Sequence, residues 1–241
     1  MDSTLYELFY ELEDEHWWFQ GRKRLVLSLL TRYQPCPQPR ILDVGCGTGG
    51  MLADYEGFGP SLGLDTAPEA GHFCGLRGLS VVLGSGTHLP MADSSVDVVS
   101  ALDVIEHVED DRAILREMWR VCSAGGLLLL TVPAFQFLWS SHDDLNHHKR
   151  RYILPDLALR LREAGFRPLK LSYYNSLLMP AAVLRKFLLK ARSNGAGGHL
   201  ERLPAPLNAV FRSVLAFERP LLARADLPIG ASIICAATRL D

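Results

Sequence analysis

Histidine, aspartate and arginine gather in one short stretch of this 241-residue chain, WSSHDDLNHHKRRY at residues 139–152. Imidazole titrates near neutral pH, so a histidine here could remove a proton from an acceptor hydroxyl. Arginine carries a planar, permanently charged group that suits phosphate and carboxylate, so its side chains could hold an anionic acceptor. We therefore predict a substrate-binding loop with two catalytic candidates, His142 and His147, and three binding candidates, Arg150, Arg151 and Tyr152.

Three other interpretations of this loop stay open. A metal site is one, because His142, Asp143, His147 and His148 offer imidazole and carboxylate ligands, but their spacing matches no metal signature and we assign no metal. A nucleic-acid contact is another, although the cations at 149–151 stand alone in a chain whose net charge is −2, which argues against general nucleic-acid binding. A solvated turn is the third.

A glycine-rich turn, LDVGCGTGG at residues 42–50, offers a second kind of chemistry. Glycines let a chain turn sharply and bring backbone N–H groups close to a ligand, although such a turn can also be purely structural. The spacing Gly45-x-Gly47-x-Gly49 differs from the dinucleotide pattern GxGxxG and lacks the lysine of a phosphate-binding loop. Asp65 follows about 20 residues later, where an acid can accept hydrogen bonds from a ribose diol.

Short apolar runs supply the elements that must position these residues. The runs are continuous rather than alternating, as expected for strands covered on both faces. Hydrophobic residues recur at helical spacing between the fourth and fifth runs, and residues 155–166 are predicted to form a second helix. This rhythm predicts an α/β fold with right-handed parallel crossovers. The expected strands are 40–45, 61–65, 79–84, 96–104, 126–132, 166–174 and 231–239.

Four ordered motifs carry a resemblance to a known family. The run LDVGCGTG, the acid at Asp65, and the stretches HLPMADSSVDVVSALDVIEHVEDD and REMWRVCSAGGLLLLTVP resemble the S-adenosylmethionine-dependent class I methyltransferases, in the small-molecule (methyltransferase domain 11-like) branch. The resemblance covers roughly residues 40–172. It implies a Rossmann-like, seven-stranded, mostly parallel sheet with helices on both faces and an antiparallel last strand. It also implies S-adenosyl-L-methionine as cofactor.

The resemblance assigns roles to residues at the ends of these strands. The methionine part of the cofactor is expected in a cradle made by Asp43, Gly45, Cys46, Gly47 and Gly49, with Asp103 near its amino-acid end. The ribose is expected on Asp65 and the adenine beside Thr66 and Ala67. One position departs from the family, because the acid that binds the adenine amino group in many members is replaced in the stretch Ser85, Gly86 and Thr87. A serine hydroxyl accepts hydrogen bonds without charge, so we expect a weaker adenine contact.

Two further segments have a structural and a functional interpretation. The segment HWWFQGRKR at residues 16–24 can be a helix packed on the core, since tryptophan buries well. Alternatively, residues 1–39 form a helical lid in which Trp18 excludes water and Arg22 binds the methionine carboxylate. His107, in VIEHVED after the fourth strand, either lies in a polar helix start or borders the substrate pocket as a third candidate base.

The composition limits the cellular compartment and the membrane association that we expect for this protein. Five scattered cysteines without a CxxC pair indicate a reducing compartment. The chain has no apolar run near the ~20 residues that cross a bilayer, and its N-terminus has no apolar signal core. We therefore expect a cytoplasmic protein, or one bound peripherally at the inner face of the membrane.

An insertion at residues 175–230 lies between the last two expected strands and interrupts the core, which comprises residues 40–174 and 231–241. It carries eight Lys or Arg against three acids, a local charge of 8 − 3 = +5. We expect two helical segments joined by the glycine-rich tip SNGAGG. They form a packed lobe, a homodimer contact, or a cap whose cationic and apolar surface meets an anionic membrane.

These observations favour methyl transfer to a small-molecule or lipid- or sugar-linked acceptor, at oxygen because of the histidines. Methyl transfer to nitrogen or carbon, and a non-catalytic S-adenosylmethionine-binding module, remain alternatives. The glycine spacing disfavours a nicotinamide-dependent oxidoreductase.

Overall fold

Seven strands form one sheet in the computed structural model, which describes residues 3–181, 183–184 and 202–240. The strand order is β3-β2-β1-β4-β5-β7-β6, and only β7 runs antiparallel to its neighbours. The Rossmann-like α/β class and the antiparallel last strand are therefore confirmed. The strands are β1 (Ile41–Val44), β2 (Ser61–Asp65), β3 (Val81–Leu83), β4 (Val96–Leu102), β5 (Cys122–Pro133), β6 (Phe166–Tyr174) and β7 (Ser232–Arg239).

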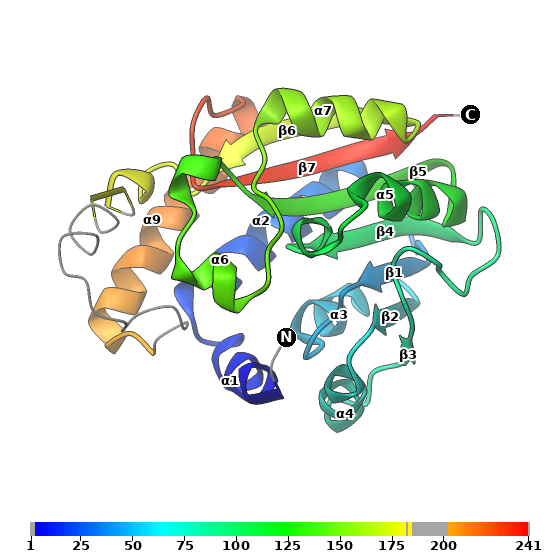
Figure 1. The fold of residues 1–241 in the computed structure, drawn as a ribbon, viewed down its shortest axis with the longest axis horizontal. Helices are drawn as coiled ribbons and strands as arrows, with labels where there is room; N and C mark the ends of the chain where they lie inside the picture. Colours follow the sequence, from blue (N-terminus) through cyan, green and yellow to red (C-terminus); the bar gives the residue numbers. More distant parts are fainter. Residues whose placement is uncertain (1–2, 182, 185–201, 241) are drawn as a thin grey trace.

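Helices cover both faces of this sheet, which explains why the central strands are apolar throughout rather than alternating. Figure 1 shows α5 and α7 in front of the strands and α2 behind them. The front layer packs Ile114 and Leu157 on the sheet, and the back layer packs Leu25 and Leu222. The described helices are α1 (Ser3–Leu12), α2 (Trp17–Tyr33), α3 (Gly50–Tyr55), α4 (Pro68–Leu76), α5 (Asp111–Val121), α6 (Ser141–Leu145), α7 (Leu154–Glu163) and α9 (Ala205–Arg224).

Two local features of the structure go beyond the expected elements. Strand β5 begins at Cys122, directly after α5, because a register shift between Val96 and Val98 lets the strand pair with β4 earlier than its apolar run suggests. The loop at 139–152 contains the short helix α6, which starts with a capping box between Ser140 and Asp143.

The insertion is described in part. Helix α9 lies beside α2, and Gly21 of α2 permits this approach, because a Cβ there would lie 2.3 Å from Leu215 Cδ1. The other predicted helical segment and the tip SNGAGG fall largely within 185–201, outside the described residues. No helix among the described residues is long and apolar enough to cross a membrane.

Candidate active site

The glycine turn lies where β1 ends, between β2 and β4. Gly45, Gly47 and Gly49 have φ values of +71°, +55° and +84°, which favour glycine. A Cβ at Gly45 would lie 2.5 Å from Val104, whereas one at Gly47 would meet nothing within 4 Å. The turn is therefore tight on its inner side and has open space in front of Gly47. The Cys46 side chain is buried against Cys74, so only its backbone can line that space.

Asp65 ends β2 beside this turn. Its carboxylate accepts hydrogen bonds from the backbone N–H groups of Gly47 at 2.9 Å and Ala67 at 3.0 Å. The hydroxyl of Tyr6, on α1, donates to it at 3.3 Å. Two backbone donors fix the carboxylate in position, and the tyrosine shows that it can still accept a hydroxyl, which is the chemistry that a ribose diol requires. Thr66, the next residue, is exposed.

A second charged group lies across the turn, at the end of β4. Arg22 of α2 forms an ion pair with Asp103, and its guanidinium lies 4.4 Å from the ring centroid of Trp18. Asp103 has a φ of +57°, so its backbone leaves the strand in the left-handed region. Burial raises the pKa of Asp43 to about 7, although a hydrogen bond with Ser100 and the charge of Arg22 oppose this shift. These groups can hold both ends of an amino acid, an ammonium on the carboxylates and a carboxylate on Arg22.

The N-terminal segment contacts the glycine turn directly. Glu13, between α1 and α2, forms an ion pair with Arg77, which also donates to the backbone carbonyl of Thr48 at 3.1 Å. A Cβ at Gly50 would lie 2.2 Å from the Glu13 carboxylate. Helix α2 packs along the sheet, as the structural interpretation expected, while α1 reaches Asp65. Whether residues 1–39 act as a lid stays a prediction.

The third strand contributes the stretch that departs from the family pattern. Ser85 Oγ lies 2.8 Å from Thr87 Oγ1, which lies 3.1 Å from His88 Nδ1. A Cβ at Gly86 would lie 2.6 Å from Ile114, so this glycine is required by helix packing. The hydroxyl of Ser85 remains near the surface as an uncharged hydrogen-bonding group.

Glu106, His107 and His148 meet beyond the end of β4. Glu106 and His107 lie in a 3-10 helix (Ile105–His107), and the rings of His107 and His148 lie 4.6 Å apart at 89°. Burial lowers the pKa of His107 to about 4, so its imidazole is neutral at neutral pH. Burial also raises the pKa of Glu106 well above its usual range. Of the three histidine candidates, only His107 lies in this group.

Asp143 organises the loop that carries the remaining candidates. Its carboxylate is fully buried and accepts from His148 Nδ1 at 2.8 Å, from Arg151 at 2.8 and 2.9 Å, and from the Ser140 backbone at 2.8 Å. His142 lies on α6, with its ring 6.2 Å from that of His148. His147 is exposed and has a φ of +56°.

The two arginines of the loop lie in internal ion pairs rather than pointing freely outward. Arg150 pairs with Asp111 at 3.2 Å, whereas the guanidinium of Arg151 is fixed on Asp143. Tyr152 is 2% exposed and donates to Asp111 at 2.9 Å. The structure therefore uses the Tyr152 side chain inside the fold, where it cannot reach an acceptor on the surface.

Sequence reasoning missed the roles of Tyr6, Glu106 and Asp143. Tyr6 donates to a carboxylate that is distant in sequence, and Glu106 is buried beside His148, which is also distant in sequence, so local pattern gives no indication of either. The sequence did indicate a structural role for Asp143, because the spacing Ser140-x-x-Asp143 is that of a capping box in which aspartate replaces the usual glutamate.

Comparison with known proteins agrees with this geometry. Residues 42–130 match a family model described as a methyltransferase domain. A Mycolicibacterium smegmatis protein described as a probable S-adenosylmethionine-dependent methyltransferase is 31% identical over 160 residues, covering 64% of this chain and 61% of that protein. Ajmaline N-methyltransferase from Rauvolfia serpentina is 30% identical over 160 residues, covering 62% of this chain and 54% of that enzyme. The chain thus spans less than two thirds of either relative.

Solved structures share the fold at low identity. Phosphoethanolamine N-methyltransferase 2 from Haemonchus contortus, in complex with S-adenosyl-L-methionine, matches with a TM-score of 0.61 at 16% identity, covering 90% of this chain and 53% of that one. An S-adenosylmethionine-dependent methyltransferase from Archaeoglobus fulgidus matches with a TM-score of 0.58 at 19% identity, covering 90% and 94%.

Proposed function

We propose that this chain, whose residues 42–130 match a methyltransferase-domain family model, is an S-adenosylmethionine-dependent class I methyltransferase that transfers the methyl group of S-adenosyl-L-methionine to a hydroxyl of a small or lipid-linked acceptor. One observation carries the proposal. The open glycine turn, the anchored carboxylate of Asp65 and the Arg22–Asp103 pair lie around one end of β1, β2 and β4. The glycine turn offers backbone N–H donors, Asp65 offers a carboxylate that can accept from a diol, and the Arg22–Asp103 pair offers partners for the charged groups of an amino acid.

The cofactor supplies a methyl group on a sulfonium, and its leaving thioether is neutral. The protein therefore needs alignment and exclusion of water more than acid catalysis. Asp65 would hold the ribose, Arg22 the methionine carboxylate, and Asp103 the ammonium. Ser85 would give the adenine a single uncharged contact. Trp18 lies against Arg22, where its ring would shield the charged end of the cofactor from solvent.

Oxygen is the proposed acceptor atom because imidazole side chains lie on the same rim. Burial lowers the pKa of His107 to about 4, which weakens its imidazole as a base, so His107 is the weakest of the three histidine candidates for removing a proton from a hydroxyl. His142 and His147 stay candidates for the same role, and Arg150 and Arg151 stay candidates for an anionic group of the acceptor. Nitrogen and carbon acceptors are the alternatives.

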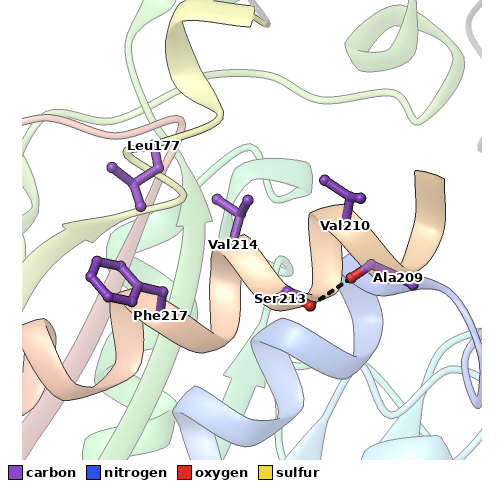
Figure 2. Close-up of a pocket in the computed structure, with 6 residues that line it drawn as sticks. All are labelled: Leu177, Ala209, Val210, Ser213, Val214 and Phe217. Carbon is purple, nitrogen blue, oxygen red and sulfur yellow. Dashed lines mark hydrogen bonds between the residues drawn. The ribbon is translucent and has the colours of Figure 1, made fainter. Parts of the chain in front are cut away.

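The face of α9 supports a lipid-linked acceptor. Figure 2 shows Val210, Val214 and Phe217 on one side of this helix, with Leu177 beside them, lining a shallow apolar pocket. Val210 is 56% and Phe217 64% exposed, which is unusual for apolar side chains grouped on one surface. We include peripheral contact with the inner face of the membrane in the proposal. Three of the eight cations of the insertion, Arg185, Lys186 and Lys190, lie outside the described residues.

Calorimetry with S-adenosylmethionine and S-adenosylhomocysteine tests the reaction class. We expect both to bind, and Asp65→Ala to weaken both by about 10-fold or more, because charge-assisted hydrogen bonds contribute about 1.5–3 kcal/mol. Glu69→Ala, which removes a nearby acid on α4, serves as the matched control. Absence of binding at high micromolar concentration would reject the proposal. Cofactor binding without turnover of any acceptor would favour the non-catalytic module.

Vesicle sedimentation tests the membrane contact separately. We expect the protein to sediment with anionic vesicles, less with neutral ones, and the variant Val210→Ser/Phe217→Ser to sediment less than wild type. Leu76→Ser, which removes an equally exposed leucine from α4, should sediment like wild type. Equal sedimentation of all three proteins, or of none, excludes α9 as the membrane contact.

A further inference from the structure

Glu106, His107 and His148 form a compact group of ligand atoms. One carboxylate oxygen and one ring nitrogen from each histidine all lie within 4.8 Å of one another. Two of these residues are adjacent in the chain, and the third comes from the loop after β5. This loop is fastened at the same place, because the backbone N–H of Lys149 donates to the Glu106 carbonyl at 2.7 Å.

Each imidazole has one ring nitrogen occupied, which orients the other. His148 binds the buried carboxylate of Asp143 through Nδ1 at 2.8 Å. His107 forms a hydrogen bond with the backbone of Asn146. A neutral imidazole that donates from one nitrogen has a lone pair on the other, and histidines that bind metals are oriented by carboxylates and carbonyls in this way.

The carboxylate of Glu106 lacks a side-chain hydrogen-bond partner among the described residues. Its side chain is 0% exposed, and neither oxygen has a hydrogen-bond partner among the described residues. The nearest cations are committed elsewhere, because Arg22 pairs with Asp103 and Arg151 pairs with Asp143. A buried carboxylate needs a proton or a cation, and one ring nitrogen of each histidine lies within 4.8 Å of a Glu106 carboxylate oxygen.

We propose that Glu106, His107 and His148 bind a divalent first-row transition ion such as Zn²⁺, Mn²⁺ or Co²⁺. Two imidazoles and a carboxylate are a ligand set that these ions accept, and three protein ligands leave coordination positions open. The group directly follows β4 and Asp103, at the rim proposed for the cofactor. The open positions take an oxygen of the acceptor, which rests on the proposed function. His107 then acts as a ligand rather than as a base, and His142 and His147 remain the candidate bases.

Cobalt titration of the full-length protein tests the site without cofactor or acceptor. After removal of metals with a chelator, we expect Co²⁺ to bind at a single site per chain with visible absorption bands, and to raise the melting temperature. Glu106→Gln, which keeps the shape of the side chain, and His148→Gln should each weaken binding by more than about 100-fold. His147→Asn is the control, because this exposed neighbour lies outside the group and asparagine tolerates its positive φ.

Circular dichroism shows whether Glu106→Gln and His148→Gln are folded. One folded variant of the two is enough to test the site. The proposal fails if wild type takes up no Co²⁺ at equimolar concentration, or if folded Glu106→Gln or His148→Gln binds Co²⁺ as wild type does. Acetohydroxamate, a chelator that binds through oxygen, should change the spectrum of the cobalt protein, and an unchanged spectrum rejects the open positions. S-adenosylhomocysteine binding by the metal-free protein is measured in parallel, so failure of the metal site and failure of the methyltransferase proposal are distinguished.

Discussion

Replacing Arg22 by Ala should weaken binding of only those ligands that carry the amino acid of the cofactor. Arg22 lies at the end of β4, paired with Asp103 and stacked on Trp18. Its side chain is 15% exposed, so a ligand carboxylate that reaches it leaves most of its water behind. The guanidinium of Arg22 can donate two parallel hydrogen bonds to such a carboxylate, one to each oxygen.

The magnitude follows from this position. A hydrogen bond to a charged partner contributes about 1.5–3 kcal/mol. At about 1.4 kcal/mol per factor of ten, loss of the contact weakens binding by about 10- to 150-fold. The partial burial of Arg22 favours the upper half of that range, because solvent screens the pair less.

Calorimetry with two ligands separates this contact from general damage. S-adenosylhomocysteine carries the amino acid, whereas 5′-methylthioadenosine keeps the nucleoside and lacks it. We expect Arg22→Ala to lose affinity for the first and to stay within about threefold of wild type for the second. Arg24→Ala, at an exposed position of the same helix, should bind both normally. An equal loss for both ligands would show that Arg22 only supports the fold, and no loss would remove it from the site.

Two stability predictions follow from buried carboxylates. Burial raises the pKa of Asp43 to about 7, so the folded protein holds this proton more tightly than the unfolded chain does. The contribution of this proton to stability is present below about pH 4 and is lost as pH rises to about 7. Urea unfolding of wild type and Asp43→Asn at pH 4 and pH 7 should therefore show that the variant gains on the order of 3 kcal/mol in free energy of unfolding relative to wild type between the two pH values. A difference between the two proteins that does not change with pH contradicts the raised pKa. Glu218, fully buried on α9, accepts the backbone N–H groups of Asn175 and Leu177 at 2.7 Å each. Glu218→Ala leaves both donors unpaired and should reduce the free energy of unfolding by about 2–4 kcal/mol; a loss as small as that of the exposed control Arg219→Ala would contradict this account.

The sheet could be predicted from the sequence because its strands are short, buried runs. Each run at β1, β2 and β4 is mostly apolar and is covered on both faces, so neither register nor partner had to be known to locate it. The start of β5 at Cys122 could not be predicted in the same way, because it depends on an irregularity in pairing with β4. Local pattern gives the centre of a strand, while its ends depend on neighbours.

The candidate site was predictable where glycine or an acid closes a strand. Asp65 and the glycine turn follow from that rule. The role of Glu106 does not, because its proposed partner His148 arrives from the loop after β5. That loop owes its shape to the ion pairs of Asp143, which draw together residues whose order along the chain carries no spacing pattern.

The contact at Gly21 lies between two surfaces that share no residue, the apolar face of α9 and the proposed cofactor site. Leu215 of α9 occupies the place of a side chain on α2, one residue before Arg22, so the two helices are in direct contact beside the proposed carboxylate ligand. A ligand that displaces α9 and moves α2 with it would change the free energy of cofactor binding, because Arg22 lies on α2. By thermodynamic reciprocity, the cofactor changes the affinity of that ligand by the same factor. Binding of a membrane or an acceptor on α9 would then change the affinity for the cofactor at the glycine turn, and cofactor binding would change the affinity for the membrane or acceptor.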